Sequence, residues 1–192
     1  MVINRKLRAF IAVPLSEDVL EGLRISQEAL RETGVAASFP RISSLHITLK
    51  FLGDITPDQV SGIREKLEDS ISGFQEFDVE IKGLGAFPST IRPKVAWAGL
   101  KSGGCLERLQ EEVEASMRKL GFEPERRRFS PHITLARIKS SRNLDMLEAM
   151  LESMKDFDIG RIPVRAVRLY QSILNPEGAV HKVLAEVHSS EQ

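Results

Sequence analysis

Two short segments of the sequence carry the same pattern of reactive residues, His46-Ile47-Thr48-Leu49 and His132-Ile133-Thr134-Leu135. Alternate side chains of a β-strand lie on opposite faces of its sheet. In each segment the histidine and threonine would therefore share one face, while the isoleucine and leucine would share the other and can be buried. The repeat predicts two strands that each present an imidazole and a hydroxyl on one side.

Two histidines that face each other across a cleft suit the cleavage of a phosphodiester without a metal ion. Imidazole titrates near neutrality, so one ring can be neutral and the other protonated at the same pH. The neutral ring accepts a proton from the attacking water, and the protonated ring donates one to the leaving oxygen. The hydroxyls of Thr48 and Thr134 can donate hydrogen bonds to the non-bridging oxygens. The symmetry of the pattern does not say which histidine donates.

The elements around the motifs occur in an order that repeats along the chain. Helices are predicted to begin near residues 16, 56, 103 and 143, the second of them with the capping box Thr56-Pro57-Asp58-Gln59. Strands are predicted at residues 7–13, 45–52, 77–84, 94–100, 129–138, 162–174 and 179–187, with a turn at residues 175–178 between the last two.

The order strand, helix, motif strand, helix, strand therefore occurs twice, and Phe10 and Trp97 are predicted to occupy equivalent places. This pattern indicates an internal duplication within a single domain, residues 1–192, divided at roughly 1–90 and 91–192. We expect an α+β fold with two pseudo-symmetric lobes, each an antiparallel sheet flanked by helices, around a central cleft.

Composition restricts the kind of partner. The 27 basic and 27 acidic residues cancel, so recognition of a nucleic acid must be local and must favour a strand end or a small molecule. No apolar run approaches the roughly 20 residues of a membrane helix, and no leader segment is evident. The single cysteine, Cys105, excludes an internal disulfide and a cysteine-rich metal site. We expect a cytoplasmic monomer without metal or cofactor.

Nearly the whole chain resembles the two-histidine phosphoesterase superfamily, and most closely the RNA 2′,3′-cyclic phosphodiesterases, formerly called 2′-5′ RNA ligases. The resemblance lies in residues 8–12 (Arg-Ala-Phe-Ile-Ala), residues 45–53 (Leu-His-Ile-Thr-Leu-Lys-Phe-Leu-Gly) and residues 129–137 (Phe-Ser-Pro-His-Ile-Thr-Leu-Ala-Arg). It implies hydrolysis of a terminal 2′,3′-cyclic phosphate on RNA to a 2′-phosphate, with a weak reversible 2′-5′ joining activity.

The resemblance also implies residue roles. His46 would be the proton donor and His132 the proton acceptor, with Thr48, Thr134, Arg137 and Phe10 binding the substrate. Strict alternation would turn Arg137 away from the cleft, so its role requires the strand to bend or end near residue 136.

Several neighbouring residues have two interpretations. Lys50 lies two residues after Thr48, so on a regular strand it would share the face of His46 and Thr48 and could help neutralise phosphate. Alternatively, it is solvated at the rim of the cleft. Phe10 or Trp97 could stack on a base or pack in the core. The cluster Arg126, Arg127 and Arg128 could hold the RNA backbone or form a solvated loop. We assign no role to His181 and His188.

Two other functions use the same cleft. The chain could be a cyclic phosphodiesterase for small nucleotides, or a non-catalytic module that binds RNA ends or nucleotides. Turnover of a cyclic mononucleotide distinguishes the first, and binding without product distinguishes the second.

Overall fold

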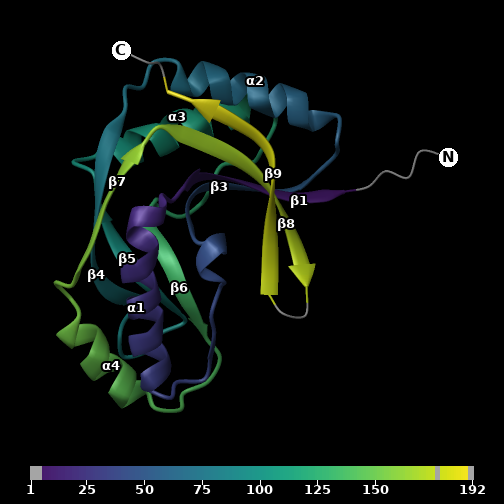
Figure 1. Ribbon diagram of the computed structural model, residues 1–192. Coiled ribbons are helices and arrows are strands. Elements are labelled where there is room, and N and C mark those ends of the chain that lie inside the picture. The colour runs from purple at the N-terminus through teal and green to yellow at the C-terminus, as the bar shows by residue number, and fades with distance from the viewer. Residues whose placement is uncertain (1–5, 176–177, 190–192) are drawn as a thin grey trace.

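The computed structural model describes residues 6–175 and 178–189 and contains a mixture of helices and strands (Figure 1). The α-helices are α1 (Leu20–Glu32), α2 (Gln59–Ile71), α3 (Cys105–Lys119) and α4 (Leu144–Ser153). The strands are β1 (Leu7–Pro14), β2 (Ala37–Ser38), β3 (His46–Ile55), β4 (Phe77–Phe87), β5 (Val95–Lys101), β6 (His132–Ile138), β7 (Asp158–Val164), β8 (Ala166–Asn175) and β9 (Gly178–His188). Residues 176–177 of the predicted final turn lie outside the described residues.

The strands named above all belong to one sheet, in the order β7-β4-β5-β6-β3-β1-β8-β9, with the short β2 paired to β6. Neighbouring strands in this order are antiparallel, which confirms the predicted α+β class. The two halves of the sheet are not separate, because β3 and β6 join them through the pair Ile47 and Ile133. The two motif strands are therefore neighbours at the centre of the sheet.

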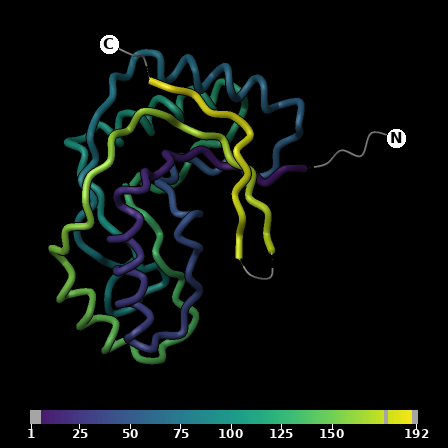
Figure 2. Tube along the Cα trace, in the orientation of Figure 1, coloured from purple at the N-terminus to yellow at the C-terminus, as the bar shows by residue number. Residues whose placement is uncertain are grey.

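The spatial halves of the sheet do not coincide with residues 1–90 and 91–192. Strand β4 comes from the first part of the chain but pairs with β5 and β7. Strands β8 and β9 come from the second part, and β8 pairs with β1. Figure 2 shows β8 and β9, at the yellow end of the colour range, running side by side. The first part of the chain thus gives β4 to the other half of the sheet, the second part gives β8 and β9, and this exchange interlocks the two halves.

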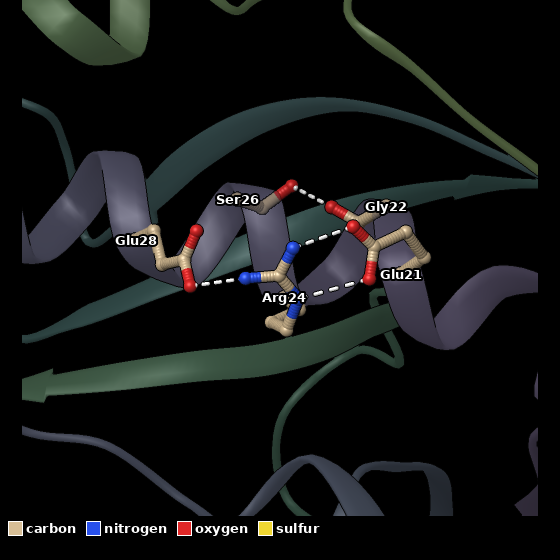
Figure 3. Close-up of polar contacts among 5 residues, drawn as sticks. All are labelled: Glu21, Gly22, Arg24, Ser26 and Glu28. Atoms are coloured by element: carbon tan, nitrogen blue, oxygen red, sulfur yellow. Dashed lines mark hydrogen bonds and ion pairs between the residues drawn. The ribbon is translucent and has the colours of Figure 1, made fainter.

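One face of the sheet is packed against the α-helices. Each helix contributes to the same buried core, through residues such as Leu23 of α1, Leu67 of α2, Val113 of α3 and Leu147 of α4. The outer side of α1 is polar, and there Arg24 is paired with acidic side chains one turn away on either side (Figure 3). The opposite face of the sheet has its own small cluster of Phe10, Ala12 and Tyr170. This second face is the one that carries the motif histidines.

The predicted strand at residues 162–174 is wrong, because it combines the end of β7 with β8. The strand is interrupted at Arg165, where the chain passes from one edge of the sheet to the other half. Strand β7 pairs with β4, whereas β8 pairs with β1. Alternating apolar residues continue across the break, which hides it in the sequence. One of the two hydrogen bonds of the predicted capping box is present, because the Thr56 backbone N–H donates to Gln59 Oε1 at 2.9 Å, and α2 begins at Gln59.

Within the described residues, every helix is too short or too polar to cross a membrane.

Candidate active site

The two motif strands lie side by side and present the histidines and threonines on one face. Because β3 and β6 are antiparallel with Ile47 opposite Ile133, His46 lies across from Thr134 and Thr48 lies across from His132. Both isoleucines are completely buried on the helix side. The strand parity predicted from the sequence therefore gathers two imidazoles and two hydroxyls at the centre of the open face.

Each histidine is fixed by the same backbone contact. The Nδ1 of His46 lies 2.8 Å from the Ser44 carbonyl oxygen, and the Nδ1 of His132 lies 2.7 Å from that of Ser130. A carbonyl oxygen only accepts, so each Nδ1 carries a proton and donates it. The Nε2 atoms are consequently left to exchange protons with a substrate. The repeat thus begins two residues earlier than we predicted, as Ser-x-His-Ile-Thr-Leu.

Both motif strands contain a β-bulge at the leucine of the motif. On β3, Thr48 pairs with Ala12 and Lys50 with the adjacent Ile11, so Leu49 is an extra residue. On β6, the same irregularity makes Leu135 the extra residue. A bulge shifts the alternation of all later side chains on its strand. The two residues after each leucine therefore lie on the faces opposite to those expected.

The bulge at Leu135 places Arg137 on the same face as the motif histidines. Arg137 pairs with Val95, two positions along β5 from the Trp97 that pairs with Thr134. After burial, which is the main cause, the Arg137 charge also lowers the pKa of both His46 and His132, so the guanidinium lies near both rings. The Leu135 carbonyl accepts a hydrogen bond at 3.0 Å from Nε2 of the buried Gln27, which supports the bulge from α1.

The bulge at Leu49 has the opposite consequence for Lys50, which does not join the cleft. Its side chain is only 1 % exposed and turns to the helix side. There its Nζ donates to Glu114 Oε1 at 2.7 Å and to the Glu123 carbonyl at 2.9 Å. Both interpretations of Lys50 made from the sequence, as a cleft residue or a solvated rim residue, are therefore wrong.

His46 lies in an aromatic cluster formed by residues of β1, β8 and β9. Its ring centroid is 4.7 Å from that of Phe10, 5.1 Å from that of His181 and 6.2 Å from that of Tyr170. Burial is the main cause that lowers the pKa of His46 to about 4, and the charges of His181, His132 and Arg137 lower it further. His46 is consequently neutral at pH 7 when the cleft holds no anion.

Two members of this cluster differ from the sequence predictions. Phe10 is only 3 % exposed and stacks on Tyr170 at 5.2 Å, so its ring supports His46 and has little free area for a base. His181, to which we assigned no role, lies at the site, and burial lowers its pKa too. It comes from β9, far along the chain from both motifs, and only the pairing of β8 with β1 brings it there. His188, in contrast, is paired with Glu186 at 3.0 Å.

His132 has a less crowded environment than His46. The Phe87 ring lies edge-on at 5.1 Å, and Trp97 packs against Phe87 at the same distance. Burial lowers the pKa of His132 as well. The registers also correct the predicted equivalence of Phe10 and Trp97, because Trp97 pairs with Thr134 where Ala12 pairs with Thr48.

Comparison with known proteins adds to this geometry. Residues 17–173 match the model of the 2′-5′ RNA ligase superfamily. An Aeropyrum pernix protein named RNA 2′,3′-cyclic phosphodiesterase is 41 % identical over 165 residues, covering 85 % of this chain and 93 % of the relative. A Methanothermobacter thermautotrophicus protein of the same name is 32 % identical over 176 residues, covering 92 % and 95 %.

Solved structures share the fold. The crystal structure of TT0787 from Thermus thermophilus superimposes with a TM-score of 0.79 at 26 % identity, covering 95 % of this chain and 97 % of that one. E. coli LigT complexed with 3′-AMP gives a TM-score of 0.79 at 20 % identity, covering 97 % of this chain and 100 % of that one. By its sequence match and by its relatives, this chain belongs to the 2′-5′ RNA ligase superfamily.

Proposed function

We propose that this protein hydrolyses the 2′,3′-cyclic phosphate at the 3′ end of RNA to a 2′-phosphomonoester, without a metal ion. One observation carries the proposal: two imidazoles on adjoining strands, each with Nδ1 held by a backbone carbonyl and with Nε2 left for proton transfer. The relatives named RNA 2′,3′-cyclic phosphodiesterase support the substrate class.

In the proposed reaction, His132 takes a proton from the attacking water and His46 gives a proton to the departing 3′ oxygen. Thr48 and Thr134 donate hydrogen bonds to the non-bridging oxygens, and Arg137 adds a positive charge that holds the phosphate. When the 5′-hydroxyl of a second RNA replaces water as the nucleophile, the same groups give a weak, reversible 2′-5′ joining of RNA ends, in which the P–O3′ bond again breaks and the 3′ oxygen takes the proton. These roles follow the resemblance to the superfamily, and the geometry allows them.

The low pKa of His46 adds one requirement to this scheme. A ring with a pKa of about 4 is neutral at pH 7 and has no proton on Nε2 to donate. An anionic phosphodiester placed beside it favours the imidazolium and raises its pKa. The proposed role of His46 as proton donor therefore requires that its ring gain a proton as the substrate binds, so we expect binding to be accompanied by proton uptake. Calorimetry of substrate-analogue binding in buffers of different ionisation enthalpy measures that uptake.

The test uses an oligoribonucleotide that ends in a 2′,3′-cyclic phosphate, with the product identified by chromatography and mass. We expect His46→Ala and His132→Ala each to lower kcat by about 10²- to 10⁴-fold, while the unfolding midpoint stays close to that of the unmodified protein. His188→Ala is the matched control, because this histidine lies on β9 outside the cluster around His46. Normal turnover in either motif variant, or saturable binding with no product, would contradict the proposal.

A further inference from the structure

A groove of about 550 Å³ begins where the two motif strands separate. One wall is the continuation of β3, Phe51 to Asp54, and the other is the segment from Gly121 to Arg127 that leads from α3 toward β6. The first wall follows His46 and Thr48 directly along the chain, and the second precedes His132. The groove is therefore an extension of the candidate active site rather than a separate pocket.

Phe51 presents an uncovered aromatic ring in this groove. The bulge at Leu49 turns Phe51 to the face of the motif histidines, where it pairs with Phe10 across β1 and β3. Its side chain is 57 % exposed, whereas Phe10, 6.2 Å away between ring centroids, is buried. An exposed aromatic ring beside a nucleotide-processing cleft is suited to stacking on a base.

Charged groups of both signs surround that ring. Arg126 and Arg127 are exposed, and neither takes part in an ion pair within the described residues. Three acidic residues, Asp54, Glu123 and Glu125, also line the groove. The groove is therefore not uniformly positive, as a channel for several backbone phosphates would be. A single nucleotide fits this mixture, because its phosphate accepts from guanidinium groups and its base offers N–H donors to carboxylates.

The ion pair between buried Lys50 and partly exposed Glu114 fixes the second wall of the groove. Lys50 Nζ donates to the Glu123 carbonyl at 2.9 Å, and the Glu125 backbone N–H donates to Glu114 Oε1 at 3.1 Å. Since Lys50 is adjacent to Phe51 on β3, one strand holds both the stacking ring and the anchor of the arginine segment. The groove is consequently preformed, and a nucleotide would not have to order it.

We propose that this groove binds the nucleotide on the 5′ side of the terminal cyclic phosphate, with its base on Phe51 and its phosphate near Arg126 and Arg127. This inference rests on the proposed function, because it assigns the upstream part of the same substrate. It predicts that the enzyme prefers RNA ends to cyclic mononucleotides because the groove binds one additional nucleotide of the RNA.

The experiment compares two substrates, adenosine 2′,3′-cyclic phosphate and the dinucleotide ApA with a terminal 2′,3′-cyclic phosphate. We expect kcat/KM for the dinucleotide to be about tenfold higher, as one stacked base provides. Phe51→Ala should abolish most of this preference, Phe51→Trp should retain it, and the double variant Arg126→Gln, Arg127→Gln should reduce it and weaken its dependence on salt. Met146→Ala and Arg161→Gln, an exposed methionine on α4 and an exposed arginine on β7, are the controls.

Two results would contradict the proposal that this groove binds the upstream nucleotide. One is an unmodified protein with no preference for the dinucleotide, and the other is a Phe51→Ala variant that loses activity equally on both substrates. If the unmodified protein hydrolyses neither substrate, the proposed function fails, and the groove is then judged by binding alone. In that case fluorescence-detected binding of dinucleotide and mononucleotide 2′-phosphates must show the same Phe51-dependent difference.

Discussion

The two motif strands, β3 and β6, are alike up to the leucine of the motif and differ beyond it. Each has a serine carbonyl on the histidine Nδ1, a threonine on the same face and a bulge at the leucine. After the bulge, β3 continues with buried Lys50 and exposed Phe51, while β6 continues with buried Ala136 and exposed Arg137. Residues at the same two positions thus anchor a groove wall in one half and bring a positive charge near the motif histidines in the other.

The surroundings of the two histidines differ as well. His46 is packed among Phe10, Tyr170 and His181, whereas His132 contacts Phe87 at its edge. Burial and neighbouring charge lower both pKa values, and that of His46 falls to about 4. A duplicated motif therefore supplies two similar rings in unequal surroundings, and the proposed proton donor, His46, is the ring whose surroundings hold its pKa near 4.

The largest expected difference between the two histidines appears when the leaving group of the substrate is changed. A proton donor is needed when the leaving oxygen is the basic ribose 3′ oxygen, but not when it is p-nitrophenolate. We expect His46→Ala to lose about 10²- to 10⁴-fold on an RNA cyclic phosphate and much less on bis(p-nitrophenyl) phosphate, while His132→Ala loses similarly on both. Steady-state rates on the two substrates measure this. If instead the His132→Ala variant regained more activity on bis(p-nitrophenyl) phosphate, His132 would be the proton donor and His46 the proton acceptor.

The next effect concerns stability at the position after the bulge. Lys50→Ala leaves Glu114, which is 15 % exposed, without its partner and should lower the free energy of unfolding by about 3–5 kcal/mol. The exposed pair of Arg24 with Glu21 is the comparison, and Arg24→Ala should cost less than about 1 kcal/mol. Urea denaturation measures both. Replacing Lys50 and Glu114 together by apolar residues should restore part of the loss, which separates an unpaired charge from a simple cavity.

The shared face of the histidines and threonines could be predicted from the sequence, because that prediction needed only local geometry. Alternation along a strand places His46 with Thr48 and His132 with Thr134, and the repeat indicates that the two faces belong together. The bulges were beyond this reasoning, since Leu49 and Leu135 are ordinary buried leucines and a bulge is defined by the partner strand. That is why the orientation of Lys50 was predicted wrongly and Arg137 required a bend.

The rest of the site depends on pairings between distant parts of the chain. His181 and Tyr170 reach His46 only because β8 is exchanged into the half that contains β1 and β3. Alternation within β9 places His181 on one face of its strand, but it does not say which strands lie beside it. A duplicated chain that exchanges strands has the same sequence pattern as one that does not, so the lobe boundaries could not be predicted either.

The smallest effects concern the pH dependence of kcat/KM, and they distinguish the surroundings of the two histidines. A reaction that needs one neutral and one protonated imidazole has a bell-shaped profile whose limbs report the two pKa values of the free enzyme, whichever ring is the donor. Because both pKa values are lowered, the optimum should lie below pH 6.5, with the acid limb near pH 4.

Two variants should move these limbs differently. Beyond the larger effect of burial, the Arg137 charge lowers the pKa of both histidines, so Arg137→Gln should move both limbs to higher pH, whereas Arg137→Lys should leave them in place. The His181 charge lowers only the pKa of His46, so His181→Phe, which keeps a ring in the cluster, should raise the acid limb alone. Equal movement of both limbs in His181→Phe would show that the two histidines respond as a single coupled pair, and the contrast between their surroundings would then have no role in dividing the work.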